Sequence, residues 1–262
     1  MKYLTFIFIL ISLCACSQTK PIKKPDEQKT PETIAYVMNP NPTDSLCISD
    51  IERAKKEIKD GKIVFTQSAG FLFGNIRYEE ELRKLCEEHG LVFDFDLIGC
   101  IVFEGQTQGC YGDYMDEIIK KKFGSKFKEQ LHIHADSMFL LNVNSKNKTV
   151  QYWDCDERPR LPNENKRTSD YLPNITVSEI DINGSKGWPF FDLGFIVEKD
   201  STVSNFYVGN FVAESNENKK YKDKLFAIAV QYIQSKYPTW IPGKIKGVPI
   251  RTDNNVRIFL TK

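Results

Sequence analysis

Apolar positions recur along the first half of the chain at the spacings that distinguish helices from strands. Within residues 77–89, Leu82, Leu85 and Cys86 fall on one helical face, and Gly90 stands where helices commonly stop. Comparable patterns predict three further helices, over residues 50–59, 114–123 and 125–137.

Strict alternation of apolar and acidic residues predicts a strand over residues 91–97. Phe93, Phe95 and Leu97 are expected on its buried face, with the intervening acidic residues in solvent. Further strands are predicted over 62–67 and, as a hairpin around 145–148, over 139–143 and 150–153. Residues 46–157 are therefore expected to form a small α+β domain of unknown role.

A polar, proline-bearing segment over residues 158–173 interrupts these patterns. Long strand patterns, one helix and a final strand follow it. We therefore expect an α+β fold of two small domains, residues 46–157 and 174–262, joined by a linker over 158–173.

The N-terminus has the pattern of an export signal. Lys2 supplies a positive charge, and the apolar run over residues 3–13 is too short to span a bilayer. The residues that close this run, Leu13-Cys14-Ala15-Cys16, resemble a bacterial lipobox. The resemblance implies that residues 1–15 are a signal peptide and that Cys16 becomes the acylated N-terminus. An ordinary signal peptide and a failed anchor helix are the alternatives.

Residues 16–45 are expected to form an extended tether, because they are rich in proline and lysine and hold little that packs. A terminal arm packed on the domain is the alternative. Lipid on Cys16 would make a membrane the first partner of the protein. Ser17 lacks the acidic retention signal of inner-membrane lipoproteins, which favours a location in the cell envelope on the outer membrane. No acidic cluster of the kind linked to surface export follows Cys16, so the protein is expected to face the periplasm.

Residues 191–262 carry three features in a fixed order. Two strand patterns flank Asp200-Ser201, a helix is predicted over 221–236, and the segment Trp240-Ile241-Pro242-Gly243-Lys244 leads to Gly247-Val248-Pro249-Ile250. Together they resemble the C-terminal domain of TonB, whose corresponding connection is Trp-x-Pro-Gly-Lys…Gly-x-Pro-Val. The chain departs from that family at Ser201, where glycine is usual, and in a longer polar segment over 214–220.

The resemblance implies a sheet packed by one helix and binding by strand addition, in which an extended peptide pairs with an exposed sheet edge. The expected edge is the last strand, formed by Asn255, Val256, Arg257, Ile258, Phe259 and Leu260. A rigid structural corner is expected from Trp240, Pro242, Gly243, Gly247 and Pro249.

These expectations describe a lipid-anchored envelope protein, a non-catalytic interaction module for a periplasmic or outer-membrane protein or peptide. A TonB-like energy transducer is one alternative, but transducers need a transmembrane helix and a long proline-rich span. An envelope enzyme that uses cysteine or histidine is the other alternative. Sensitivity of an activity to alkylation or to chelators would favour the enzyme.

The charge balance, 36 basic against 35 acidic residues, argues against nucleic acid as a partner, since phosphate binding needs a basic excess. After cleavage and lipidation an odd number of cysteines remains, namely Cys47, Cys86, Cys100, Cys110 and Cys155. In an oxidising compartment we expect a disulfide between Cys100 and Cys110 that closes a short loop. A buried free thiol and a cysteine nucleophile are the alternatives.

Three other groups suggest chemistry without a complete motif. His132 and His134 would share a face on a strand and chelate a metal ion, but their segment is predicted to be a helix end, where they diverge. Asp94 and Asp96 suit an acid–base pair, and solvated strand positions explain them equally. A third group consists of aromatic residues that would either line a carbohydrate or peptide cleft or belong to the core and its rim, namely Tyr111, Tyr114, Tyr152 and Trp153. No metal or cofactor is expected.

Overall fold

The structure, a computed structural model, describes residues 36–70, 74–162, 174–184 and 186–262. The predicted signal peptide, Cys16 and most of the predicted tether lie outside these residues. The described part is a mixed α+β fold, as predicted. Its elements follow in the order α2 (Ser45–Lys59), β1 (Val64–Ala69), α3 (Glu79–Glu88), β2 (Val92–Leu97), α4 (Cys110–Phe123), α5 (Phe127–Ser145), β3 (Val150–Gln151), η1 (Tyr152–Asp154), β4 (Ile175–Thr176), β5 (Phe190–Val197), β6 (Val203–Val212), η2 (Asn216–Tyr221), α6 (Lys222–Lys236), β7 (Lys244–Ile245), β8 (Val248–Pro249) and β9 (Thr252–Thr261).

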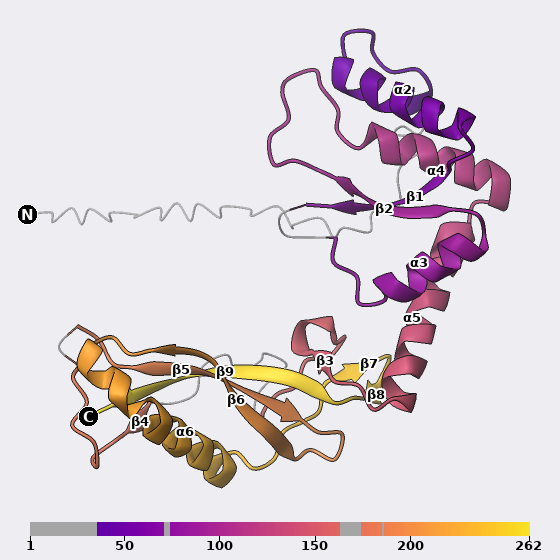
Figure 1. Cartoon of the computed structure of the whole chain (residues 1–262). Helices are drawn as coiled ribbons and strands as arrows, with labels where there is room; N and C mark the ends of the chain where they lie inside the picture. Colours follow the sequence, from indigo (N-terminus) through magenta and orange to yellow (C-terminus); the bar gives the residue numbers. More distant parts are fainter. Residues whose placement is uncertain (1–35, 71–73, 163–173, 185) are drawn as a thin grey trace, which may run out of the picture.

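In the N-terminal part, β1 and β2 form a parallel two-stranded sheet, and α3 connects them. Figure 1 shows α2 and α4 on one side of this sheet and α3 and α5 on the other. Phe65 of β1 and Phe93 of β2 are buried in one cluster with Leu82 of α3 and Ile119 of α4. The predicted strands and helices of this core are present, shifted by a few residues at their ends.

Helix α2 begins at Ser45, earlier than predicted, because the carboxylate of Asp44 caps it. This side chain accepts a hydrogen bond of 3.0 Å from the amide of Cys47 and one of 2.7 Å from the hydroxyl of Tyr36. Val37 is buried as well. The prediction of a tether up to residue 45 is therefore wrong over residues 36–44, which pack on the folded part.

Helix α5 runs through the segment that was predicted to be a hairpin strand over 139–143. It ends only at Ser145, and Val143 near its end packs against Val150, Ile245 and Ile250. A short apolar run does not by itself distinguish a buried helix from a strand. The hairpin prediction is wrong, and α5 instead reaches from the core of the N-terminal part to the β7–β8 turn.

The C-terminal part is built on a sheet with the strand order β3-β9-β5-β6, and β4 also pairs with β9. Helix α6 packs on one face of this sheet through Leu225, Ala229 and Ile233, the residues predicted to form its buried face. Residues 158–162 of the predicted linker also pack here, since Leu161 belongs to the same core and Arg160 exchanges backbone hydrogen bonds with Ile241.

The predicted edge strand Asn255–Leu260 is part of β9, which is paired fully on one side and only at its two ends on the other. It pairs antiparallel with β5 over residues 252–259. On its other side it pairs in parallel with β3 at Thr252 and Asp253 and with β4 at Leu260 and Thr261, and among the described residues no strand pairs with 254–259 there. The segment of β3 was predicted to be a strand over 150–153, but with another partner, and both short strands are too short for the sequence to indicate that they pair with β9.

The predicted corner after α6 is present. Trp240 is only 1% exposed, lies edge-on to Phe195 with 5.1 Å between ring centroids, and donates from Nε1 to the carbonyl of Tyr237. Gly247 adopts a positive φ of 76° in the turn between β7 and β8. A side chain at Gly243 would collide with Thr252, because an added Cβ would lie 2.4 Å from its Oγ1.

Candidate functional site

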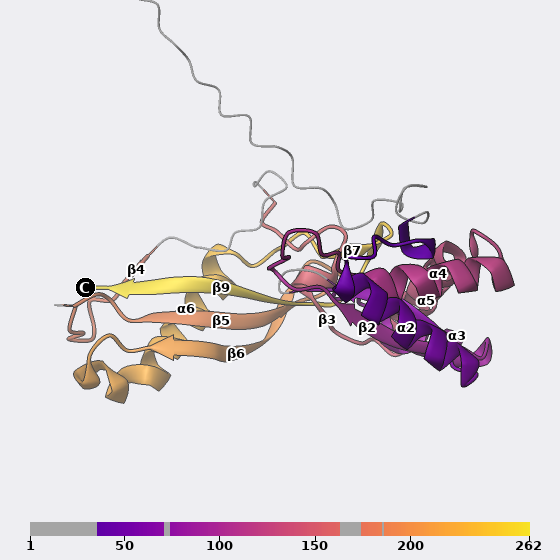
Figure 2. The ribbon, with the colours of Figure 1, turned by 90° about the horizontal axis from the view of Figure 1, so that it is seen from above.

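The face of the C-terminal sheet opposite α6 is the first candidate site. Figure 2 shows β9, β5 and β6 lying side by side. On β5 the residues that face α6, such as Phe191 and Leu193, are fully buried, and those between them, including Phe190 and Asp192, point to the opposite face. We refer to this opposite side of β5, β6 and β9 as the open face.

An ion pair crosses the middle of the open face. The guanidinium of Arg257 on β9 donates to both carboxylate oxygens of Asp192 on β5, at 2.7 and 2.9 Å. It also lies over the ring of Phe190, 4.3 Å from the ring centroid. Phe190 in turn contacts Phe259, with 5.3 Å between centroids. The result is a row of one cation and two half-buried aromatic rings with fixed positions.

Tyr207 of β6 lies across the backbone of Gly194 on β5. A Cβ at Gly194 would lie 2.1 Å from the tyrosine ring, so only glycine fits there. The hydroxyl of Tyr207 donates to Asp253 of β9 at 2.6 Å. Burial and this carboxylate raise the pKa of Tyr207 to about 12. The ring therefore stays neutral and bridges three strands at physiological pH.

The carboxylates of the open face are held in their charged form. Hydrogen bonds from Arg257 lower the pKa of Asp192, and hydrogen bonds from Arg251 do the same for Glu198 at the end of β5. Arg251 donates to both oxygens of Glu198, at 2.7 and 2.9 Å. A carboxylate in such a bidentate pair is poorly suited to proton transfer near neutral pH.

Strand β6 borders the open face and is the outermost strand of the sheet. Within the described residues it pairs only with β5, through a register with two irregularities. Asn205, Tyr207, Gly209 and Asn210 along it are exposed. An outer strand leaves a row of backbone N–H and C=O groups without a ladder partner. β6 is thus one open edge of the sheet, and among the described residues the middle of β9, 254–259, is open on the opposite side.

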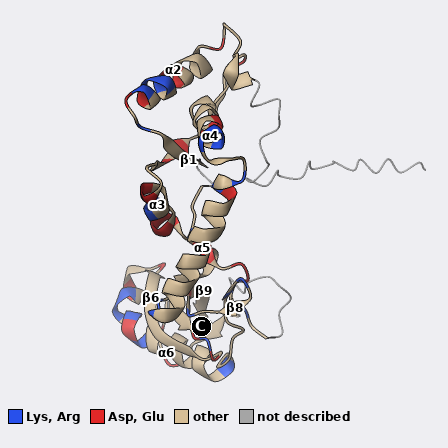
Figure 3. Ribbon diagram, turned by 90° about the vertical axis from the view of Figure 1, so that its right-hand side faces the viewer, with Lys and Arg blue, Asp and Glu red and all other residues tan. Residues whose placement is uncertain are grey.

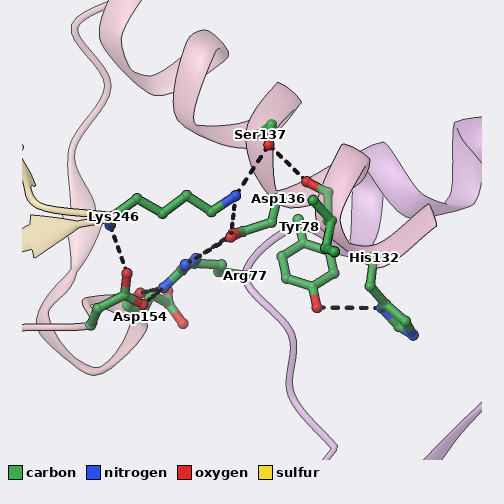
Figure 4. Close-up of polar contacts among 9 residues, drawn as sticks. Arg77, Tyr78, His132, Asp136, Ser137, Asp154 and Lys246 are labelled. Carbon is green, nitrogen blue, oxygen red and sulfur yellow. Dashed lines mark hydrogen bonds and ion pairs between the residues drawn. The ribbon is translucent and has the colours of Figure 1, made fainter. Parts of the chain in front are cut away.

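A second cluster joins the N-terminal part to the C-terminal part, as Figure 4 shows. Arg77, before α3, donates to both carboxylate oxygens of Asp136 on α5, at 2.7 and 3.0 Å, and also to Asp156. Lys246 in the β7–β8 turn donates from its amide to Asp156 at 2.7 Å, and its Nζ lies 3.0 Å from Asp136. Two carboxylates and two cations thus connect α5 to the β7–β8 turn.

Charge pairing outweighs burial in this second cluster. Burial disfavours the cation of Arg77, but the hydrogen bonds to Asp136 and Asp156 raise its pKa overall. Burial also opposes the charge of Asp156, but the hydrogen bonds from Arg77 and from the amide of Lys246, together with the charges of both residues, offset that effect and lower its pKa. The four side chains satisfy one another's hydrogen bonds, so the cluster fixes the arrangement of α5 against the β7–β8 turn.

Polar groups at the centre of the N-terminal part are also satisfied. Lys128 of α5 forms an ion pair with Asp116 of α4 and donates to the carbonyl of Thr66 at 2.8 Å. Asp96 is buried, contrary to the prediction that it is solvated, and accepts from the amide of Gly112 at 3.2 Å. The first turn of α4 covers this end of β2, which leaves Leu97 exposed instead. Asp94 stays exposed, so the two carboxylates lie in different surroundings.

The predicted disulfide between Cys100 and Cys110 is wrong. Cys110 is bonded to Cys47, with 5.2 Å between their Cα atoms, and Cys100 is exposed and free. The pairing follows from the packing of α2 on α4, a contact between segments far apart in the sequence. Cys86 is buried, and burial raises its pKa to about 12. Its thiol is therefore not suited to a nucleophilic role.

The two histidines of the predicted metal candidate lie on helix α5 and diverge. Nδ1 of His132 lies 3.3 Å from the hydroxyl of Tyr78, as Figure 4 shows, whereas His134 is exposed. No group of three or more potential metal ligands gathers anywhere in the part of the chain that the structure describes.

The aromatic residues of the predicted cleft lie in two separate places. Tyr111 and Tyr114 of α4 pack beside α2, and the hydroxyl of Tyr111 donates to Glu57 at 2.8 Å. Tyr152 and Trp153 lie in η1 and contact each other edge-on. They do not line a common cleft.

The residues of the open face were not predicted from the sequence, although the sequence contains one signal for them. Asp192 and Gly194 alternate with apolar residues on β5, and Arg257 does so on β9. Alternation predicts that Asp192 and Gly194 share a face. Only the strand register shows that Arg257 lies opposite Asp192.

The chain matches no protein-family model, no curated protein and no solved structure. Among the described residues, no helix has the length and apolar character needed to cross a membrane.

Proposed function

We propose that this protein is a non-catalytic, lipid-anchored component of the bacterial cell envelope that binds an extended segment of another envelope protein. Acylated Cys16 would anchor it to the outer membrane on the periplasmic side. Residues 46–157 and 174–262 would act as two domains, the second similar to the C-terminal domain of TonB. The bound segment would add as a strand to β6.

The exposed edge of β6 is the observation that carries this proposal. The strand has ten residues and no neighbour beyond β5 among those described. The amide of Leu260 donates to the carbonyl of Pro189, the residue before β5. Backbone groups along a strand point alternately to its two neighbours, so every second residue after Pro189 directs its N–H and C=O to β9. Leu193 is one of these residues, and it stands opposite Val208 of β6. The amide of Val208 therefore points away from β5, where an added strand would accept its hydrogen bond.

The open face gives the added strand a surface for side-chain recognition. Side chains of a strand next to β6 would alternate between the α6 side and the open face. Those on the open face would lie beside Tyr207 and Asn210, both exposed on β6. A segment with polar or aromatic residues at alternate positions fits this surface.

Site-specific photo-crosslinking in cells tests the proposal. A photoreactive amino acid replaces Asn205 or Asn210, whose side chains are exposed on β6. A discrete cross-linked partner is expected at both positions, and no such product from Glu88, an exposed position on α3. Equal products from all three positions, or none from β6, would reject binding at this edge.

A matched pair of variants then tests the backbone contribution. Val208→Pro removes the outward amide, whereas Val208→Ala loses side-chain volume but keeps the amide. The cross-link should disappear in the proline variant and persist in the alanine variant, with circular dichroism and thermal unfolding reported for both. If proline unfolds the sheet, Val203→Lys places a charge on the same edge and serves as the second variant.

A further inference from the structure

The loop between β2 and α4 exposes a run of apolar side chains. Leu97, Ile101, Val102 and Phe103 leave 79%, 74%, 54% and 77% of their surfaces accessible. Four large apolar residues within seven positions of one loop form a patch, unlike the singly scattered exposed residues that any surface carries. We call residues 97–103 the apolar loop.

The segment that follows holds the apolar loop in place. Gln108 accepts from the amide of Gly99 and donates to the carbonyl of Ile101, both at 2.7 Å. Gln106 accepts from the amide of Leu46 at 2.9 Å and donates to the carbonyl of Thr43 at 3.1 Å. These hydrogen bonds hold the loop in a conformation that leaves its apolar side chains exposed. Because the loop is already ordered, binding would cost less conformational entropy.

The segments that form and support the apolar loop carry almost no charged side chains. Residues 36–49 and 97–109 contain one aspartate, Asp44, one glutamate, Glu104, and no lysine, arginine or histidine, and Asp44 is fully buried. The basic residues of α2 lie in its second half, from Arg53 onward, as Figure 3 shows. A surface of this kind offers no electrostatic attraction to a charged partner, so its affinity must come from apolar burial.

The first described residues lie beside this loop. Tyr36 donates to Asp44, and the same carboxylate accepts from the amide of Thr107 at 3.2 Å. The disulfide between Cys47 and Cys110 joins the same two segments. About 20 residues separate Cys16 from Tyr36, and a tether of that length, as predicted from the sequence, would have a mean reach of about 25 Å. Lipid on Cys16 would keep this end of the molecule near the bilayer.

We propose that the apolar loop inserts its side chains into the interface of the bilayer that holds the lipid anchor. A lipid bilayer fits this patch because residues 97–103 carry no charge and because the patch lies beside the segment that begins at Tyr36, about 20 residues after Cys16. Insertion would add a second membrane contact and fix the orientation of the N-terminal part on the membrane. The inference rests on the lipid anchor of the proposed function, but not on strand addition at β6.

Vesicle sedimentation of the mature chain carrying Cys16→Ser, and hence no lipid, tests this contact directly. Vesicles of phosphatidylethanolamine and phosphatidylglycerol are the probe. The chain should sediment with them equally at low salt and at high salt, because the contact is apolar. Ile101→Asp combined with Phe103→Asp should reduce the partition coefficient at least about tenfold.

Leu141→Asp is the matched control, since Leu141 is 70% exposed on α5, outside the apolar loop. It should leave the partition unchanged, and thermal unfolding should show that all variants are folded. A polarity-sensitive fluorophore on the exposed Cys100 should shift to shorter wavelength with vesicles.

Failure of the parent chain to partition, or equal loss in the Leu141 variant, would overturn the proposal. A dimer of the parent chain in analytical ultracentrifugation would also overturn it, if the parent does not bind vesicles and the double variant is monomeric. The patch would then contact a second copy of the chain. Acylation of Cys16 is measured separately, by membrane fractionation of cells that express the natural sequence or Cys16→Ser. Failure of the anchor and failure of the loop are therefore distinguishable.

Discussion

The backbone amide of Trp240 donates a hydrogen bond of 2.9 Å to the carbonyl of Ser201. This contact ties the corner after α6 to the turn between β5 and β6. The turn is constrained further by Asp200, which accepts from the amide and the hydroxyl of Thr202. The position of the β6 edge therefore depends on the corner motif, although the two are far apart in sequence.

Ser201 has a φ of 75°, a left-handed conformation that disfavours residues with a Cβ. Replacing it with glycine should raise the free energy of unfolding by about 1 kcal/mol, because the steric cost disappears and the carbonyl still accepts from Trp240. Urea denaturation measures the change. Ser204→Gly, in β6, is the control and should destabilise the protein instead, because it removes the hydrogen bond from the hydroxyl to Glu198 and adds backbone freedom to a strand. A Ser201→Gly variant that is less stable than the parent would show that the turn differs from this conformation.

Trp240→Ala should lower the free energy of unfolding by about 3–5 kcal/mol, because the side chain is buried against Phe195 and its Nε1 is hydrogen-bonded. Trp153→Ala is the matched control, since Trp153 is 54% exposed, and should change it by less than about 1 kcal/mol. Near-equal effects of the two substitutions would contradict a structural role for the corner.

Elements with a clear period and local stop signals were predicted well from the sequence. Helix α3 ends before Gly90, whose φ is 68°, and α6 buries the three residues of its predicted face. In both cases the information is local. The amphipathic spacing determines the buried face, and a glycine marks the end of the helix.

Features that depend on distant packing were not predicted. The burial of Asp96 requires the amide of Gly112, and the partner of Cys110 is supplied by α2. The pairing of the two ends of β9 involves β3 and β4, two strands of two residues each. Strands so short carry no period. The open face likewise needed the register of β5 against β9, which no single strand pattern contains.

The disulfide between Cys47 and Cys110 closes a loop with a sequence separation of 63 residues. Replacing Cys47 with serine should destabilise the protein by about 4 kcal/mol at most, because the unfolded chain regains the entropy of that loop. Cys100→Ser should have little effect. Peptide mapping of the non-reduced protein checks the pairing, and a cross-linked peptide of Cys100 with Cys110 would contradict it.

The bidentate pair of Arg77 and Asp136 predicts a large effect for a conservative change. Arg77→Lys keeps the charge but loses the fork geometry, and should cost about 2–3 kcal/mol, because Asp136 is 8% exposed and must stay paired. Hydrogen exchange should increase in the β7–β8 turn, which Lys246 and Asp156 connect to this pair. Arg83→Lys is the control, because Arg83 is 45% exposed beside Glu79. Equal effects at both arginines would show that the cluster does not hold the two parts together.

The ion pair of the open face predicts how stability depends on pH. The hydrogen bond from Arg257 lowers the pKa of Asp192 below its ordinary value of 3.8, so the folded state prefers the ionised carboxylate. A lowered pKa contributes stability that is fully present above the ordinary value and is lost as the pH falls through the lower, folded value.

Asp192→Asn should therefore cost about 1 kcal/mol at pH 7, a modest amount because both side chains are partly exposed. The difference between parent and variant should shrink as the pH falls below 3.8. Arg257→Met should give the same dependence, because it removes the cause of the shift. Urea denaturation over this acidic range measures both variants, and a difference that stays constant with pH would show that Asp192 and Arg257 are not coupled.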